Sequence, residues 1–591
     1  MRSFLSRFAR ITVLACLVLA ACLGCMTAAS SDVSGPVNRP RLAVLVVFDQ
    51  MRGDYLTRWE SLFIDNGFRR LMKGGAWFEN CHYPYAHTVT AAGHASMLTG
   101  CSPDKHGIIG NEWFDRFTGK EIGCVETDRY ERVPPLSKGG GKAAETRPAA
   151  GFKWQSASPD WLLMPSVGDV LKEKTGGAGR VVSLSFKDRS AILPAGHHPD
   201  SCYWLDTATG TFVTSTFYRD RLEPWIVDFN CRQPADQWFG HDWLRIRPDL
   251  DYAAYSGPDD IRAEGVGVFQ SRTFPHPLTG GYTKVGPLYY KALYNSPFGN
   301  ELLLDLAKRA IDTLELGKHK EPDLLCLSFS CNDPIGHCWG PDSQEVMDVT
   351  LRSDRIVADL LGYLDAKVGQ GQYTVALSAD HGIGPLPELS RQQGKPAARI
   401  DPTVLSKDAE TFLEQTFGKA GEEKTRWVLD AAYPWIYLNR EVIHERGLDE
   451  AEVEDALVRW LKQQPGFLTA YGRTQLLRGL PEHDAKGAQV RRSFYPDRSG
   501  DVEAVLKPYY LCTSLLTGTH HGTPHSYDTH VPLLIFGPGV NPGTHTEVVT
   551  PQAIAAILSR ALDLPPPQGA EAPLPDGLFK NSQIQNQNST P

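Results

Sequence analysis

RLAVLVVFDQMRGDYL, residues 41–56, contains an unbroken apolar run that stops at Asp49. A half-buried strand alternates apolar and polar side chains, whereas this run has no polar residue before its end. Continuous apolar runs of this length are typical of strands buried on both faces, as in the middle of a parallel sheet. The stretch therefore predicts a central strand that ends in an acid.

Other runs of the same kind recur along the chain and also end in ionisable residues. Residues 180–191 end in Lys187 and Arg189, residues 323–337 in Asp333 and His337, and residues 373–384 in Asp380 and His381. A fifth run, residues 530–540, follows the histidine-rich segment GTHHGTPHSYDTH.

Helical patterns lie between these runs, for example at residues 300–316 and 345–368. Strands that alternate with helices predict an α/β fold, with a mostly parallel central sheet and helices on both faces. Ligands of such sheets bind beyond the carboxyl ends of the strands. We therefore expect the ionisable residues at these ends to converge on one site.

The chain of 591 residues is long enough for one large α/β enzyme with insertions. We assign residues 40–562 to a catalytic domain of this kind. The strand–helix rhythm fades at about 190–300 and 385–510, which we interpret as inserted subdomains that cap the strand ends. Residues 563–591 are rich in Pro, Gln and Asn, and we expect them to be disordered.

Residues 1–29 carry arginines ahead of an apolar run that ends in small residues, as in a secretory signal. Leu19-Ala20-Ala21-Cys22 is similar to a bacterial lipobox, and the alternative is ordinary cleavage near Ala29. We expect an exported protein of the periplasm or cell envelope. Its only membrane attachment would be a lipid on Cys22, because no later run is long enough to span a membrane.

Composition narrows the functional classes. Hydrophobic residues make up 41% and charged residues 22% of the chain, as in soluble globular proteins. The net charge of -9 argues against a surface for nucleic acid duplexes. We expect a monomer.

Nine cysteines follow the signal, and no two of them have CxxC spacing. Zinc ribbons and thioredoxin-like sites are therefore not expected. In an exported protein we expect some of the nine to form disulfides, and their odd number leaves at least one unpaired within the chain.

The strand ends supply a set of metal ligands without thiolate: Asp49, Asp333, His337, Asp380, His381 and one histidine of the segment 519–530. Oxygen and nitrogen ligands of this kind suit Zn²⁺, with Mn²⁺ or Fe as alternatives. Six protein ligands are too many for one tetrahedral zinc and fit two ions with three ligands each. Two ions about 3.5–4 Å apart can hold the attacking and leaving oxygens of an in-line phosphoryl displacement.

HTVTAAGHASMLTG, residues 87–100, places Thr88 and Thr90 just ahead of a predicted helix. One interpretation is that a threonine caps the helix. The other is that one hydroxyl is a nucleophile beside a helix N-terminus that attracts an anion. The residues alone leave both open.

These motifs resemble the alkaline phosphatase superfamily, in particular its nucleotide pyrophosphatase/phosphodiesterase branch and the phosphate-irrepressible bacterial alkaline phosphatases with a threonine nucleophile. The branch has T-x-x-[NG]-H followed by LTG and HGIIGN, seen here as residues 90–94, 98–100 and 106–111. The resemblance implies that Thr90 is the nucleophile and that Thr88 packs. It also implies two zinc sites, formed by Asp49, Asp380 and His381 with the Thr90 oxygen, and by Asp333, His337 and His521.

The choice of His521 rests on the His-Gly pair of the family, because His520, His525 and His530 lie close by. CSPDK at residues 101–105 resembles a sulfatase signature, but it has lysine where that signature has arginine and it follows LTG. We therefore keep Thr90 as the nucleophile.

Lys187 and Arg189 distinguish a monoester from a diester substrate. Two cations suit the dianionic group of a phosphomonoester, and the resembled phosphatases have this K-x-R followed by ILPAGH. Asn111 would donate to another phosphoryl oxygen. The prediction is a phosphomonoesterase that forms a phosphothreonine at Thr90. The alternatives are a phosphodiesterase on the same site and a zinc-binding envelope protein without turnover.

Overall fold

A ten-stranded mixed sheet forms the centre of the computed structural model, which describes residues 39–135, 156–422 and 425–580. Five neighbouring strands in its middle are parallel. In spatial order they are β12 (Tyr373–Ser378), β1 (Leu42–Phe48), β11 (Asp323–Phe329), β6 (Val181–Ser185) and β7 (Ser201–Asp206). Every residue of β1 is buried, because the strand has neighbours on both sides and helices over both faces. The prediction of a mostly parallel sheet is confirmed.

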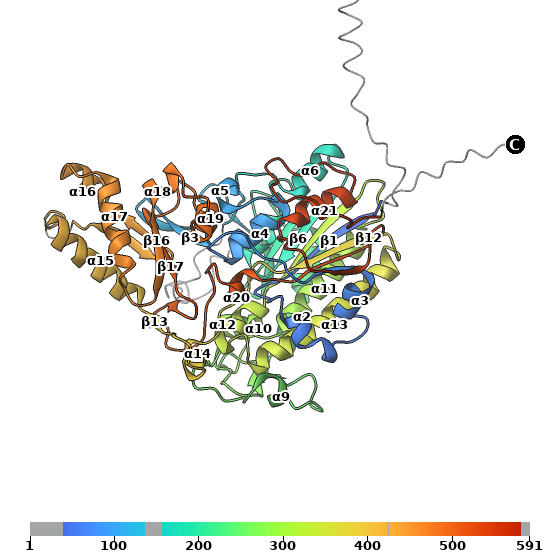
Figure 1. Ribbon diagram of the computed structural model, residues 1–591. Coiled ribbons are helices and arrows are strands. Elements are labelled where there is room, and N and C mark those ends of the chain that lie inside the picture. The colour runs from blue at the N-terminus through green and yellow to red at the C-terminus, as the bar shows by residue number, and fades with distance from the viewer. Residues whose placement is uncertain (1–38, 136–155, 423–424, 581–591) are drawn as a thin grey trace, which may run out of the picture. The chain divides into compact units, whose positions relative to one another are not determined.

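Helices cover both faces of this sheet (Figure 1). On one face lie α11 (Phe298–Thr313) and α13 (Gln344–Lys367), which correspond to the helices predicted at 300–316 and 345–368. On the other face lie α4 (Thr90–Thr99), α6 (Val167–Lys174) and α21 (Ala553–Ala561). The apolar sides of these helices and the strands form one hydrophobic core.

The strand after the histidine-rich segment runs against the others. β19 (Leu533–Phe536) is antiparallel to β12, and β2 (Ala76–Phe78) and β20 (Gly543–His545) complete that side of the sheet. Because β19 is reversed, the chain enters it at the edge where the parallel strands end. This direction brings residues 519–530 to the same edge as Asp49 and Asp380.

The first predicted insertion, at about 190–300, is partly wrong. Its residues 201–215 form β7 and β8 (Thr211–Ser215), which extend the central sheet. The aromatic side chains of this stretch, such as Tyr203 and Trp204, are buried against the core and the neighbouring helices. Its Trp and Tyr content therefore reflects packing and does not mark a separate subdomain.

The second segment, at about 385–510, forms a four-stranded antiparallel sheet of its own. The strands are β14 (Val428–Ala432), β15 (Trp435–Leu438), β17 (Val502–Leu506) and β16 (Phe467–Gly472). The helices α15 (Pro402–Phe417) and α17 (Glu450–Leu461) pack on it and share a separate hydrophobic cluster.

Residues 563–580 are ordered, contrary to the predicted disordered tail. The Leu578 side chain is completely buried, and the backbone N–H of Asn541 donates to the Leu578 carbonyl. The backbone N–H of Glu571 donates to Gly100, and the Glu571 carboxylate lies 2.7 Å from the Lys105 ammonium. The burial of Leu578 and these polar contacts thus order the segment despite its proline-rich composition.

All nine cysteines after the signal lie in the described residues, and none is paired, so the expectation of disulfides is wrong. Several, such as Cys326 and Cys202, are unpaired and buried among apolar side chains, where burial raises the pKa of the thiols. They behave as small hydrophobic residues.

The predicted signal with Cys22, and residues 581–591, lie outside the described residues. Within 39–580, apart from the two internal gaps, no helix is long and apolar enough to cross a membrane.

We expect Leu578→Ala to free the C-terminal segment, because deleting a fully buried leucine side chain costs about 2–5 kcal/mol. Hydrogen exchange should accelerate across residues 563–580. The control Leu516→Ala removes a side chain that is 85% exposed and should change nothing there. Rapid exchange of this segment in the unaltered protein would contradict the anchoring role.

Candidate active site

Three strands deliver the predicted acidic ligands to one edge of the sheet. Asp49 follows β1, Asp380 follows β12, and Asp333 lies in the first turn of α12 (Asn332–Trp339), which begins after β11. Asp49 and Asp380 are completely buried, and Asp333 is nearly so. Their convergence follows from the parallel order of the three strands.

Histidines complete two groups with metal-ligand spacing. Asp49, Asp380 and His381 form one, and their potential ligand atoms all lie within 4.8 Å of one another. Asp333, His381 and His521 form the other with the same spacing. His337 joins the second group, since its Nε2 lies 3.2 Å from Asp333 Oδ1. The structure thus brings together all six residues predicted as ligands.

Backbone carbonyls orient the three histidines of the site. Nδ1 of His337 lies 2.8 Å from the Thr519 carbonyl, Nδ1 of His381 2.8 Å from that of Gly382, and Nδ1 of His521 2.8 Å from that of Thr88. A carbonyl only accepts, so each Nδ1 carries the proton and donates. Each Nε2 is left with a free lone pair facing the carboxylates, which is the arrangement typical of metal-binding histidines.

Negative charge exceeds positive charge in this buried volume. The three carboxylates face a single ammonium, that of Lys187, which lies 2.7 Å from Asp49 Oδ2 and 2.8 Å from Asp333 Oδ2. Burial and the neighbouring Asp380 raise the pKa of the Asp49 carboxyl well above its ordinary value. Burial also opposes ionisation of Asp333, but the Lys187 ammonium and His337 hold its pKa well below the ordinary value.

Burial, with His381 as its neighbour, lowers the pKa of His521 well below the ordinary value, so the ring stays neutral. Buried carboxylates with too few cations are unstable unless a further cation is bound. Oxygen and neutral imidazole donors are also the set that zinc accepts. The residues present therefore fit a metal centre.

Thr90 lies between the two groups of ligands. It is the first residue of α4, and its Oγ1 lies 3.3 Å from both His381 Nε2 and Lys187 Nζ. Val89 occupies the N-cap position, and its side chain makes no capping hydrogen bond. The capping interpretation is therefore wrong for both threonines, and Thr88 instead donates to the Thr523 carbonyl.

The other histidines of the segment 519–530 have different surroundings. His525 Nε2 lies 2.9 Å from the Leu506 carbonyl, and His530 Nε2 lies 2.8 Å from the Glu79 carbonyl. His520 is exposed and stands beside His337 and His521, in a third group that contains no carboxylate. His521 is the one of the four that shares a group with Asp333.

The residues predicted to bind substrate also border the site, with one difference. β6 ends at Ser185, so neither residue lies on a strand: Lys187 is the N-cap of the helix α7 (Asp188–Ala195), and Arg189 is its second residue. Asn111 accepts from the Ala91 backbone N–H through Oδ1, and its amide NH₂ has no hydrogen bond within the described residues. Arg189 Nε also lacks a partner there.

Sequence reasoning missed three neighbours of the ligands. Gln50 donates from Nε2 to Asp333 Oδ1 at 2.7 Å and from its backbone to Asp380 Oδ1 at 3.0 Å. His94 Nδ1 lies 2.8 Å from the Thr90 carbonyl and 3.2 Å from Asp380 Oδ2. Tyr294 interacts with Lys187, Asp333 and Asp49, and burial raises the pKa of its phenol. Gln50 directly follows Asp49, and His94 ends the TAAGH motif, so both positions offered a signal.

Comparisons with known proteins identify the family of the chain. The model of the type I phosphodiesterase / nucleotide pyrophosphatase family matches residues 43–528. The chain belongs to this family. Alkaline phosphatase PafA of Elizabethkingia meningoseptica is 34% identical over 90% of this chain and 93% of that protein. Alkaline phosphatase PhoV of Synechococcus elongatus is 33% identical over 92% of this chain and 94% of that protein.

A solved structure shows the same fold. The crystal structure of alkaline phosphatase PafA superposes with a TM-score of 0.82 at 33% identity, and the match covers 92% of this chain and all of that one. The predicted relation to the alkaline phosphatase superfamily and to its nucleotide pyrophosphatase branch is confirmed.

We expect His521→Ala to lower the metal content of the purified protein, because it removes one potential metal ligand of the Asp333 group. Metal analysis by mass spectrometry should find about half the metal of the unaltered protein, given three protein ligands for each of two ions. His525→Ala is the matched control, since it changes a neighbouring histidine that bonds a carbonyl, and it should keep full occupancy. Equal metal in both variants would refute the ligand assignment.

Proposed function

We propose that the protein is a zinc-dependent phosphomonoester hydrolase that acts through a phosphothreonine at Thr90. The observation that carries the proposal is the position of the Thr90 hydroxyl, between two groups of metal ligands and beside the Lys187 ammonium. A binding protein needs no nucleophile at that point. The names of PafA and PhoV, both alkaline phosphatases, support the same activity here.

Two zinc ions per chain would bind, one to Asp49, Asp380 and His381 and the other to Asp333, His337 and His521. When bound, the ions supply Lewis acidity that ionises the nucleophile, activates water and stabilises the leaving oxygen. Gln50 positions this machinery, since one side chain and its backbone fix Asp333 and Asp380 together.

The chain itself binds and orients the phosphoryl group. Thr90 begins a ten-residue helix whose N-cap residue makes no side-chain hydrogen bond, so the first-turn amides other than that of Ala91 can attract an anion. Asn111 presents its free amide NH₂ to a phosphoryl oxygen, while its Oδ1 is held by Ala91. Lys187 and Arg189 add two positive charges. The Thr90 oxygen attacks phosphorus in line as the ester P–O bond breaks and the alcohol leaves. Water then cleaves the phosphothreonine to inorganic phosphate and restores the Thr90 hydroxyl.

These cations favour a monoester, because its transferred group is a dianion with three non-bridging oxygens. A diester carries one negative charge and an organic substituent in place of one oxygen. The alternative is a phosphodiesterase on the same ligands, which the family description favours. Turnover of p-nitrophenyl phosphate and of its bis-ester by the zinc-loaded protein decides between them, and faster hydrolysis of the bis-ester would overturn the proposal.

The proposal also covers the substrate class, the oligomeric state and the location of the protein. The substrates are small phosphorylated molecules, the protein acts as an exported monomer of the periplasm or cell envelope, and a lipid on Cys22 would be its only membrane attachment. Nucleic acid duplexes are not substrates.

We expect Thr90→Ala to keep its metal and to lose turnover by about three orders of magnitude or more, because it removes only the nucleophile. Thr88→Ala should lower turnover by less than about tenfold, since that hydroxyl donates to a backbone carbonyl. Acid quenching during turnover should trap a labelled phosphothreonine in the unaltered protein alone. The reverse order of the two variants would show that Thr88 is the nucleophile.

We expect the double variant Lys187→Ala/Arg189→Ala to slow monoester hydrolysis far more than diester hydrolysis. Each lost charge-assisted contact weakens transition-state binding by about 2–4 kcal/mol, or roughly thirty- to a thousandfold in rate. Rates of p-nitrophenyl phosphate and its bis-ester should be measured together with metal content, because Lys187 also contacts Asp49 and Asp333. Equal slowing of both substrates at full metal content would leave the pair a structural role.

A further inference from the structure

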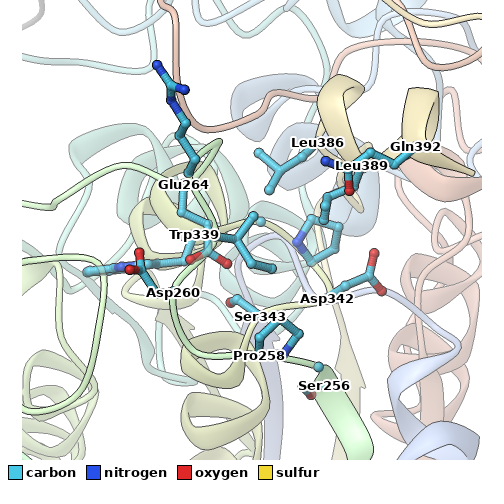
Figure 2. Close-up of a pocket in the computed structure, with 15 residues that line it drawn as sticks. Ser256, Pro258, Asp260, Glu264, Trp339, Asp342, Ser343, Leu386, Leu389 and Gln392 are labelled. Carbon is cyan, nitrogen blue, oxygen red and sulfur yellow. The ribbon is translucent and has the colours of Figure 1, made fainter. Parts of the chain in front are cut away.

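A cavity of about 410 Å³ lies between the loop 256–264, the end of α12 and the helix α14 (Pro387–Gln392). Figure 2 shows Leu386, Leu389 and Gln392 on one side of it and Asp260, Glu264 and Trp339 on the other. None of the residues that line it belongs to the groups of metal ligands. The cavity is therefore separate from the proposed active site.

Glu264 is the unusual residue of this cavity. Its side chain lines the cavity, yet the residue is only 2% exposed. Its Oε2 has no hydrogen bond, and its carboxyl forms no ion pair, with any residue of the described ranges. The Ile261 amide favours its charged form only weakly against burial. A buried carboxylate without a cation is costly, so the free carboxyl keeps its proton until a ligand supplies a cation.

The surroundings of Glu264 are acidic, and their own cations are already used. Glu345 of α13 lies close enough to oppose ionisation, and one of its oxygens lies 3.1 Å from His276 Nε2. Asp259 pairs with Arg245 at 2.9 Å, and Asp260 pairs with Arg272 at 2.9 Å.

Arg262 also lines the cavity but forms no ion pair with Glu264 in the described structure. Arg262 is exposed, and the charged groups that act most on the Glu264 carboxyl, Glu345, Asp259 and Asp260, are all acidic.

We propose that this cavity binds an organic cation, a primary ammonium compound whose nitrogen lies against the Glu264 carboxylate and whose hydrocarbon part lies along Leu386 and Leu389. The apolar side chains of Pro258, Ile261, Leu386 and Leu389 form much of the wall.

The size and geometry of the cavity favour an organic ion over a metal ion. A water molecule takes up about 30 Å³ of liquid, so the cavity has room for a chain of many atoms. Within the described residues, no group of three metal ligands close enough to hold an ion includes Glu264. A metal ion would also leave the apolar wall unused.

Binding should depend on pH in a defined direction. Burial, then Glu345, and then Asp259 and Asp260 raise the pKa of Glu264 to about 9. Below that pH the free carboxyl holds a proton, which an ammonium ligand displaces. The affinity should therefore rise about tenfold per pH unit between pH 7 and 9, and each bound ligand should release one proton.

The test uses hexylammonium chloride and the full-length, zinc-loaded protein in titration calorimetry at pH 8. We expect saturable binding with proton release. In Glu264→Gln, which keeps the shape and removes the charge, binding should weaken by more than about tenfold and release no proton. Glu454→Gln is the matched control, a carboxyl that is 2% exposed, accepts hydrogen bonds from Thr474 and does not line this cavity; it should bind as before.

One further variant and one further ligand test the proposal if Glu264→Gln folds poorly. Leu389→Trp fills the cavity without changing charge and should abolish binding. The uncharged 1-hexanol should bind more weakly than hexylammonium by more than about tenfold. Absence of hexylammonium binding in the millimolar range, equal binding by Glu264→Gln or by 1-hexanol, or calcium binding in place of the amine would each overturn the proposal.

Discussion

The crowding of three carboxylates around one ammonium at the end of β1 is the constraint on which the rest of this structure depends. Asp49, Asp333 and Asp380 are buried together with Lys187, and the strands and helices around them hold them in place. Parallel strands fix the backbone beneath each acid. Without that rigid sheet edge, mutual repulsion would separate the carboxylates, and the site would lose its affinity for cations.

The three histidines at this edge are oriented by segments outside the sheet. Each of the three receives its orientation from a backbone carbonyl, and those carbonyls belong to residues 88, 382 and 519. Thr519 lies two residues before His521 and holds His337, while Thr88 holds His521 and lies two residues before Thr90. The segment of the proposed nucleophile and the segment of the proposed ligand His521 therefore position one another, so a shift in either changes both.

The fold was predicted correctly where the hydrophobic pattern of a strand reflects its position in the middle of the sheet. The apolar runs at 41–48, 323–329 and 373–378 have both faces buried, so their sequences carry no competing signal, and the acids after them fall at the expected edge. The proposed ligands were predicted from the same strand ends, except that His521 was chosen through the resemblance alone. Gln50 was missed because an amide beside an aspartate resembles an ordinary turn residue, although it bonds both Asp333 and Asp380.

The misses have common physical causes. Strands β7 and β8 were overlooked because the burial of large aromatic side chains looks like irregular composition when the partner strand is unknown. The order of residues 563–580 depends on contacts with Gly100, Lys105 and Asn541, all distant in sequence. Disulfides were expected from the compartment alone, but whether two cysteines meet is decided by packing.

The reversed direction of β19 has a consequence for how the protein matures. Because the last ligand precedes a strand near the end of the chain, the donors of one small site are drawn from residue 49 to residue 521. Such a site closes very long loops, so it is complete only when the chain from residue 49 to residue 521 has folded. A cation that binds there would bind the folded protein and not the unfolded chain, and would therefore stabilise the native state.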